Sequence, residues 1–105
     1  MTQSQQAFVA DSPITDVNSA LDLLANASYQ GAQKVVLMQA QLPPTFFDLR
    51  TGLAGEILQK SANYQMPMEI HGDFESIASK AFQAFLIECN RTGHLIFVQQ
   101  PKDNP

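Results

Sequence analysis

The chain has 105 residues, a formal net charge of −4 and a pI of about 4.8, and 45% of its residues are hydrophobic. Length and composition predict one globular domain over residues 1–105. The acidic balance argues against nucleic acid as a partner, because phosphate binding relies on clustered Lys and Arg. No apolar run approaches the roughly 20 residues of a membrane span, so we expect no membrane association.

The two ends of the chain are polar. Residues 1–6 lack the basic and apolar regions of a secretory signal, and residues 101–105 contain two prolines, so we expect both segments to be flexible tails. The single cysteine, Cys89, cannot form an internal disulfide, which suits a reducing compartment. We therefore expect a soluble, cytoplasmic protein.

The first half of the chain alternates short apolar runs with one amphipathic stretch. Residues 7–10 predict a short strand. Residues 17–28 place apolar side chains at helical spacing, and Thr15 or Asp16 is suited to cap that helix. The continuous apolar run over residues 34–39 is typical of a strand buried on both faces.

The second half continues the alternation. Residues 46–63 predict a loop that leads into an amphipathic helix. A strand over residues 66–72, a helix over residues 73–91 and a strand over residues 94–98 follow. Strands alternating with helices indicate a small two-layer α/β domain, with a mostly parallel sheet of about four strands and three helices.

Two glycines, Gly52 and Gly55, lie near the start of the helix within residues 46–63. Each costs roughly 1 kcal/mol relative to alanine in a helix interior, so a bare backbone should be needed there. Close helix packing, the approach of a partner, or a phosphate at the helix N-terminus would each explain them. No Lys-Ser/Thr pair follows, so the segment is not a P-loop.

Other polar residues suggest sites more weakly. His71, Gly72 and Asp73 end a predicted strand, where open parallel sheets bind ligands, but a turn with Asp73 capping the next helix is the favoured interpretation. No two metal-ligating residues have ligand spacing on one element, so no metal is expected. Cys89 falls on an apolar helix face, which predicts a buried, inert thiol.

Several runs resemble the bacterial family known as domain of unknown function 4180 (DUF4180). They cover residues 14–24, 46–60, 70–74 and 85–90, and the likeness extends over most of residues 14–98. The resemblance implies a fold and no reaction. It also implies additional elements at both ends, so the chain looks shortened, with a sheet edge or helix face left uncovered. We expect a second copy to provide the cover, as a homodimer.

Asp48 followed by residues 51–55 (Thr-Gly-Leu-Ala-Gly) is similar to the Asp-Ser-Ser-Gly-Leu-Gly run of STAS domains, the fold of anti-sigma-factor antagonists. There the run opens a helix and holds a phosphorylatable serine. The resemblance implies a STAS-like fold, and makes Thr51 the candidate phosphorylation or anion site together with the two glycines. The intervening Leu49-Arg50 dipeptide departs from the STAS pattern.

No catalytic constellation accompanies these motifs. We therefore predict a non-catalytic regulatory protein, without a cofactor, that acts by binding another protein; the expected role is an antagonist of a transcription regulator. A small-ligand or anion-sensing module, using the loop at residues 45–51 and the helix N-terminus, is the alternative. A small enzyme around Asp48, Arg50 and Asp73 is the third hypothesis.

The expected partner surface lies on the loop and first turns of this helix, because aromatic and arginine side chains often dominate interface energy. Phe46 and Phe47 are adjacent, so both can enter one core only if the loop kinks; otherwise at least one stays near the surface, beside Arg50. The alternative, in which both phenylalanines are core residues and Arg50 is merely solvated, is left open. The predicted surface comprises Phe46, Phe47, Arg50, Leu53, Glu56 and Ile87.

Overall fold

Four parallel strands in chain order make up the sheet that the computed structural model shows for its described residues, 6–101. The strands are β1 (Ala7–Val9), β2 (Lys34–Met38), β3 (Met68–Gly72) and β4 (Leu95–Gln99). Each strand pairs with its chain neighbour, so the sheet order is β1-β2-β3-β4. The predicted parallel sheet is confirmed.

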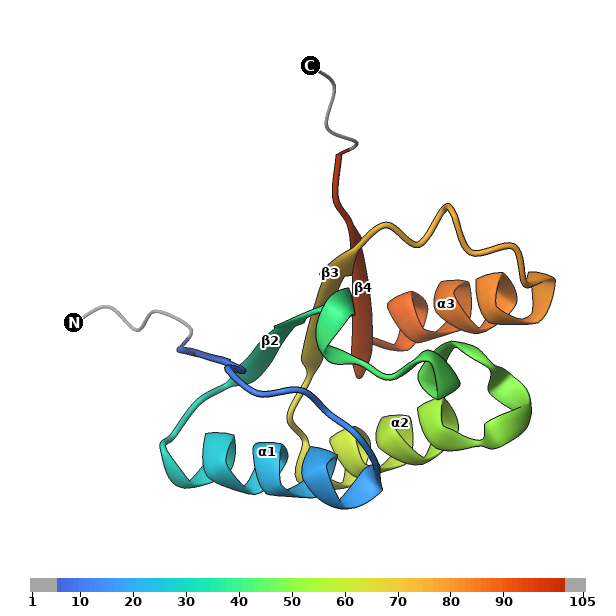
Figure 1. Cartoon of the computed structure of the whole chain (residues 1–105). Coiled ribbons are helices and arrows are strands. Elements are labelled where there is room, and N and C mark those ends of the chain that lie inside the picture. The colour runs from blue at the N-terminus through green and yellow to red at the C-terminus, as the bar shows by residue number, and fades with distance from the viewer. Residues whose placement is uncertain (1–5, 102–105) are drawn as a thin grey trace.

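Three α-helices connect the strands: α1 (Val17–Tyr29), α2 (Leu53–Tyr64) and α3 (Lys80–Thr92). Every connection moves one strand in the same direction across the sheet, and right-handed crossovers then place all the helices on one face. Figure 1 shows this arrangement, with α1, α2 and α3 on the same side of the strands. The predicted two-layer α/β architecture with three helices is therefore confirmed.

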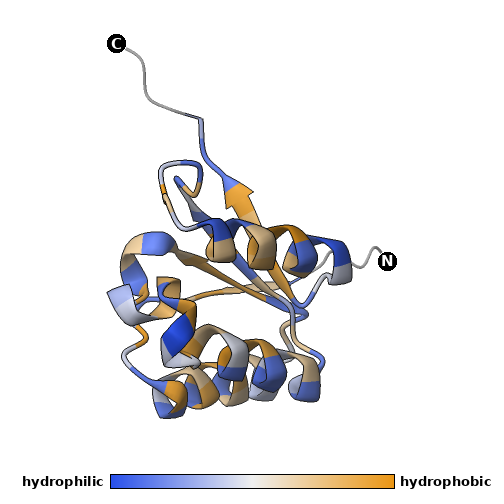
Figure 2. Ribbon diagram, turned by 90° about the vertical axis from the view of Figure 1, so that its right-hand side faces the viewer, coloured by the Kyte–Doolittle hydropathy of each residue, from blue (hydrophilic) through white to orange (hydrophobic). Residues whose placement is uncertain are grey.

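The core lies between the sheet and the helices. Leu37, Ile70 and Phe97 are aligned across β2, β3 and β4, and each is at most 5% exposed. Figure 2 shows mainly hydrophobic strands behind helices in which hydrophobic and hydrophilic residues alternate. The helices therefore contribute one apolar stripe each to the core, as their spacing predicts.

The start of α1 follows the prediction. Asp16 caps the helix: its Oδ1 accepts from the backbone N–H of Ser19 at 2.9 Å. The Ser19 hydroxyl in turn accepts from the backbone N–H of Asp16 at 3.1 Å. This reciprocal arrangement satisfies backbone donors that a helix start leaves without partners.

The third helix starts later than predicted. It begins at Lys80, and its cap is Ser79, whose hydroxyl accepts from the backbone N–H of Phe82 at 3.1 Å. Residues 73–79, before the helix, are held by contacts with distant parts of the chain. Gln99 Oε1 accepts a hydrogen bond from the backbone N–H of the buried Phe74 at 2.8 Å. The interpretation of Asp73 as a helix cap was therefore wrong, because long-range contacts hold residues 73–79 outside the helix.

Short 3₁₀ turns replace the beginning of the second predicted helix. They are η2 (Pro44–Phe47) and η3 (Leu49–Thr51), and α2 starts only at Leu53. A further turn, η1 (Gln39–Gln41), follows β2. Two consecutive turns kink the chain, which determines where Phe46 and Phe47 point.

The predicted tails, residues 1–6 and 101–105, lie outside the described residues except for Gln6 and Pro101. Between these two residues, no helix combines the length and the apolar character needed to cross a membrane.

Candidate functional site

One face of the sheet is not covered by the helices. Along β2 and β3, buried helix-side residues alternate with residues that are half-buried or exposed. The register aligns the intervening positions, for example Val36 beside Glu69 and Glu69 beside Ile96. We call this surface the open face; it comprises Val9, Lys34, Val36, Met38, Glu69, His71, Ile96 and Val98.

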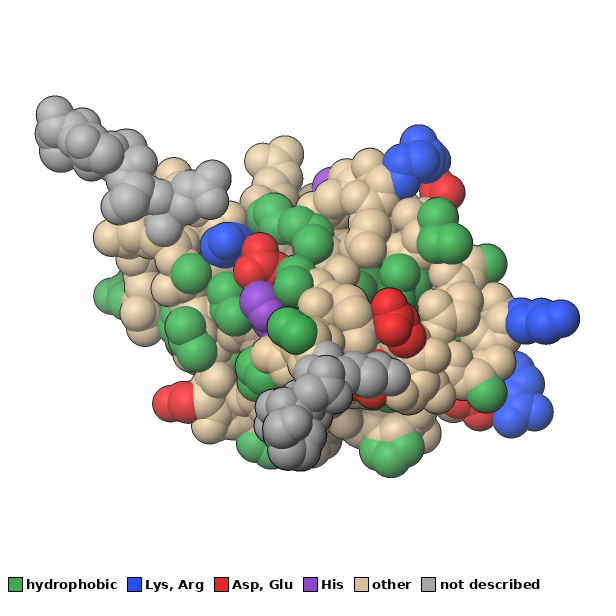
Figure 3. All heavy atoms as spheres, turned by 90° about the horizontal axis from the view of Figure 1, so that it is seen from above, with side chains coloured by type: hydrophobic (Ala, Val, Ile, Leu, Met, Phe, Trp, Pro, Cys, Tyr) green, Lys and Arg blue, Asp and Glu red, His purple; other side chains and the backbone are tan. Residues whose placement is uncertain are grey.

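The open face is largely apolar. Three of its side chains are charged or titratable and the others are Val, Ile or Met, with Val9 69% and Met38 42% exposed. Figure 3 shows acidic, basic and histidine side chains lying together, with hydrophobic side chains around them. Parallel sheets are normally covered on both faces. Within residues 6–101, this face therefore lacks the cover that a parallel sheet normally has.

The polar centre of the open face is a cluster of three side chains from β2 and β3. Glu69 Oε2 accepts from Lys34 Nζ at 3.2 Å, and Glu69 Oε1 lies 3.0 Å from His71 Nε2. The hydrogen bond with His71, and then Lys34, holds the pKa of Glu69 below its usual range. Because the carboxylate already has partners, an apolar surface can cover it without leaving a charge unpaired.

The carboxyl end of β3 carries the predicted His71-Gly72-Asp73 site. Gln39 Oε1 accepts from the backbone N–H of Asp73 at 2.9 Å, and its side chain crosses Gly72. A Cβ on Gly72 would lie only 2.4 Å from Gln39 Oε1, so this position requires glycine. A cavity of about 290 Å³ opens here, lined by Met38, Gln39, Ala40, His71, Gly72, Asp73 and Gln100.

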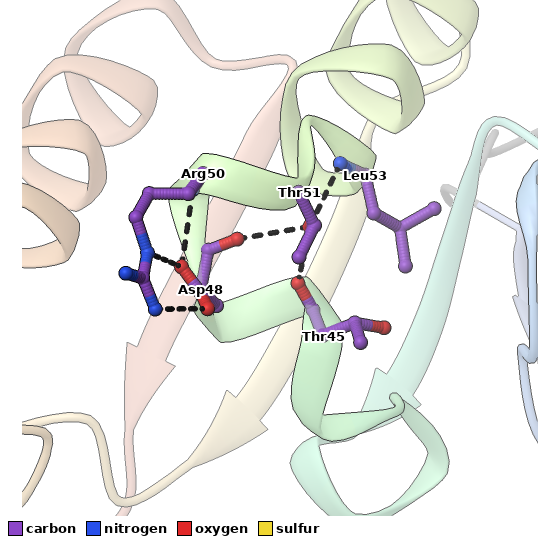
Figure 4. A network of polar contacts seen from close by, with 5 residues as sticks. All are labelled: Thr45, Asp48, Arg50, Thr51 and Leu53. Atoms are coloured by element: carbon purple, nitrogen blue, oxygen red, sulfur yellow. Dashed lines mark hydrogen bonds and ion pairs between the residues drawn. The ribbon is translucent and has the colours of Figure 1, made fainter.

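Arg50 lies on the surface, where its prediction places it. Asp48 Oδ1 accepts from Arg50 Nε at 3.0 Å and Oδ2 from Arg50 Nη2 at 3.0 Å (Figure 4). This hydrogen bonding lowers the pKa of Asp48 and raises that of Arg50. The Arg50 side chain remains 89% exposed, so a partner can reach it.

Two members of the predicted partner surface are core residues. Phe46 is completely buried and Leu53 is 9% exposed, so assigning them to a contact surface was wrong. The kink at η2 directs both phenylalanines inward. The ring centroids of Phe46 and Phe47 are 5.1 Å apart, and those of Phe47 and Phe82 are 5.4 Å apart. Phe47 is half-buried. This arrangement is the core alternative that the sequence left open.

Glu56 and Ile87 are exposed, but on different helices. Glu56 lies in the first turn of α2, and Ile87 lies on α3 with 66% of its surface exposed. Of the six predicted residues, Arg50, Glu56 and Ile87 are thus exposed, Phe47 is partly so, and Phe46 and Leu53 are buried. The exposed members do not include any residue of the open face.

Thr51 joins η3 to α2. Its hydroxyl oxygen lies 2.7 Å from the Thr45 carbonyl oxygen and 2.9 Å from that of Asp48, and it accepts from the backbone N–H of Leu53 at 3.2 Å (Figure 4). A phosphate on this oxygen would remove the hydroxyl proton and break its donor contacts. The geometry therefore assigns Thr51 a structural role at the helix start.

The two glycines of this segment have different roles. Gly52 precedes α2 with φ +81°, a left-handed conformation that explains the need for glycine. Gly55 is exposed, and nothing lies within 4 Å of the position of its missing Cβ. Close packing of Gly55 within the chain was therefore a wrong explanation.

Cys89 is buried on α3 as predicted, with 1% of its surface exposed. Burial raises the pKa of its thiol to about 11, so the reactive thiolate is scarce near neutral pH. Among residues 6–101, no three His, Cys, Asp or Glu side chains form a group that could hold a metal ion.

The open face was not predicted from the sequence. Its signal was present: β3 alternates Met68, Ile70 and Gly72 on one face with Glu69 and His71 on the other. That period-two pattern is typical of a strand with one uncovered face. The apolar run of β2 conceals the same alternation, because Val36 and Met38 are hydrophobic but lie on the open face.

Fold and site define a class: a small parallel α/β domain with its helices on one face and a partly apolar open face on the other. Within that class, the chain belongs to the family described as domain of unknown function (DUF4180), whose sequence profile matches residues 3–104. Comparison with curated proteins and with solved structures gives no match. The STAS likeness therefore stays a prediction.

Proposed function

We propose that the protein is a non-catalytic regulatory module that binds another protein through the open face. The observation that supports this most is the set of half-buried and exposed apolar side chains around the paired Glu69. A partner that covers this face would remove its apolar side chains from water, while the central carboxylate would keep Lys34 and His71 as partners.

The topology gives further support. Open parallel sheets bind cofactors and substrates where the strand order reverses, because neighbouring connections diverge there. In this sheet the order β1-β2-β3-β4 does not reverse. The fold thus favours a binding surface over a crevice at the strand ends.

The resemblance to STAS domains directs the proposal to a transcription regulator, with this protein as its antagonist. We place this activity in the cytoplasm, in keeping with a single buried thiol. A second copy is an additional proposed partner. Light scattering at micromolar concentration should then give a mass near twice the 11.6 kDa of the chain, and a mass near 11.6 kDa would contradict the homodimer.

The test of the main proposal compares two isoleucines. A partner captured stoichiometrically from the native cell is purified, and its affinity is measured for Ile96→Asp on the open face and Ile87→Asp on α3. We expect a loss of at least about tenfold for Ile96→Asp only, with melting temperatures recorded for both variants. A loss confined to Ile87→Asp or to Arg50→Ala would instead favour the surface predicted from the sequence.

A ligand-sensing function is the second candidate, supported by the 290 Å³ cavity beside His71 and Gly72. A thermal-shift screen of nucleotides and small acids tests it. A rise of several degrees with one compound, absent in a Gln39→Ala variant, would support sensing at this cavity. No shift with any compound would count against this function.

A further inference from the structure

The two edges of the sheet differ in how they are protected. At the β4 edge, the side chain of Asn90 pairs with the backbone of Phe97: Oδ1 accepts from the N–H at 2.7 Å and Nδ2 donates to the carbonyl at 3.3 Å. A side chain thus occupies the place of a neighbouring strand. Natural sheets block their edges in such ways against unwanted pairing.

The β1 edge has no comparable cover within the described residues. Gln6 and Ala10 direct their backbone groups toward β2: the Gln6 carbonyl accepts from Gln33, and the Ala10 N–H donates to Val36 at 2.9 Å. Backbone groups alternate along a strand, so those of Ala7 and Val9 point away from β2. No hydrogen bond to these outward groups occurs among residues 6–101, and Val9 is 69% exposed.

A cavity of about 250 Å³ lies beside this edge on the helix side. Phe8, Pro13 and Leu23 give it apolar walls, and Asp11 and Asp22 give it two carboxylates. No Lys or Arg lines it, and Asp22 has no ion pair among the described residues. The other lining residues are Ser12, Ile14, Ser19 and Asn26.

We propose that the β1 edge binds an extended segment of a partner protein, which adds a strand to the sheet and places a Lys or Arg side chain in this cavity. A residue paired opposite Phe8 has its side chain on the same face as Phe8, where the cavity lies. The aliphatic stem then packs on Phe8 and Leu23, and the charge reaches the carboxylates of Asp11 and Asp22.

Charge complementarity selects this occupant over a second copy of the chain. Residues 6–12 of the chain (Gln-Ala-Phe-Val-Ala-Asp-Ser) contain no basic side chain, so a second β1 could not supply the cation. Two copies paired edge to edge would also bring Asp11 and Asp22 of both cavities toward one another, which is unfavourable. The inference rests on the proposed function only in that both concern protein contacts.

The experiment uses the full chain labelled with ¹⁵N and a blocked peptide of sequence Thr-Val-Thr-Lys-Thr-Val-Thr. A matched peptide carries norleucine in place of lysine, which keeps the stem and removes the charge. We expect the lysine peptide to shift the amide resonances of Ala7 and Val9 and to bind at least about tenfold more tightly than the norleucine peptide. Equal binding, or shifts confined to other elements, would overturn the proposal.

Two variants separate the strand contact from the charge contact. Asp22→Asn should reduce binding of the lysine peptide about tenfold and leave the norleucine peptide unchanged. Val9→Pro removes an N–H that points away from β2, so it should abolish binding of both peptides while the melting temperature changes little. Retained binding in Val9→Pro, with the melting temperature of the wild type, would exclude pairing at this edge.

A second copy is also tested directly. If the chain alone is a dimer whose Ala7 and Val9 amides are protected from exchange, that copy occupies the edge and the peptide proposal is wrong. The open-face variant Ile96→Asp should bind the lysine peptide as the wild type does. Failure of the open-face proposal and failure of this one are therefore distinguishable, because each has its own variant.

Discussion

The two faces of the sheet use the same strands for different purposes. On the helix side, Ile70 and Leu37 are excluded from water and hold the helices in place. On the open face, Ile96 and Val36 keep part of their surface in contact with solvent. Stability should therefore depend on the first set and binding on the second, although the amino acid types are the same.

The largest expected effect comes from a matched pair of isoleucines on neighbouring strands. Ile70→Ala should reduce the free energy of unfolding by about 2–5 kcal/mol, because Ile70 is completely buried and its removal leaves a cavity. Ile96→Ala should cost less than about 1.5 kcal/mol, since Ile96 is only half-buried. Urea unfolding of both variants provides the measurement. Equal losses would show that the open face is as much part of the core as the helix side.

The next effect concerns the carboxyl end of β3, where the side chain of Gln39 lies across Gly72. Gly72→Ala should cost about 1–3 kcal/mol, because the new methyl group would lie 2.4 Å from Gln39 Oε1 and displace the side chain that accepts from Asp73. Thermal unfolding measures this loss. A Gln39→Gly background also removes the Gln39 Cβ, which lies 2.5 Å from the position of the new methyl group, so there the same substitution should cost much less; an unchanged cost would disprove this explanation.

A smaller effect comes from the charged centre of the open face. The pKa of Glu69 is lowered in the folded chain, first by the hydrogen bond with His71 and then by Lys34. A lowered carboxyl pKa stabilises the fold at pH values above the unfolded value, near 4.5, and this contribution disappears as the pH falls through the lower folded value. Glu69→Gln should therefore cost about 0.5–1 kcal/mol at pH 7.

The pH dependence is what identifies this contribution. Chemical unfolding of the wild type and Glu69→Gln between pH 7 and pH 3 should give free energies that converge below pH 4.5. Glu56→Gln is the control, because Glu56 is exposed on α2 and has no ion pair within residues 6–101. A constant difference between wild type and Glu69→Gln over this range would mean that the Glu69 contacts do not act through its charge.

The elements of the fold were predictable because local patterns determine them. The helical spacing over residues 17–28 and the cap at Asp16 act within a few residues, so α1 was placed to within one residue. The late start of α3 was not predictable, because Gln99, far along the chain, holds the backbone of Phe74. The sequence shows only that residues 73–79 can form a helix, not which contact prevents it.

The candidate site was less predictable than the fold. Adjacent Phe46 and Phe47 indicated an exposed aromatic side chain, but the η2 turn directs both toward the core. The open face depends on a topology in which every crossover has the same direction, and no local pattern encodes strand order. Gly72 could have been suspected from its place at a strand end, but the crossing of Gln39 is a long-range contact.

The smallest expected effect tests a helix rather than the sheet, by the same contrast between buried and exposed positions. Gly55 lies on the solvent side of α2 with open space around its Cβ position, so Gly55→Ala should stabilise the chain by about 0.5 kcal/mol. The gain is smaller than in a helix interior because Gly55 belongs to the first turn. Gly52→Ala is the control: its φ of +81° is unfavourable for alanine, so that variant should be less stable than the wild type. Urea unfolding distinguishes the two, and a Gly55→Ala variant that is destabilised by more than about 0.5 kcal/mol would contradict the open space around the Gly55 Cβ position.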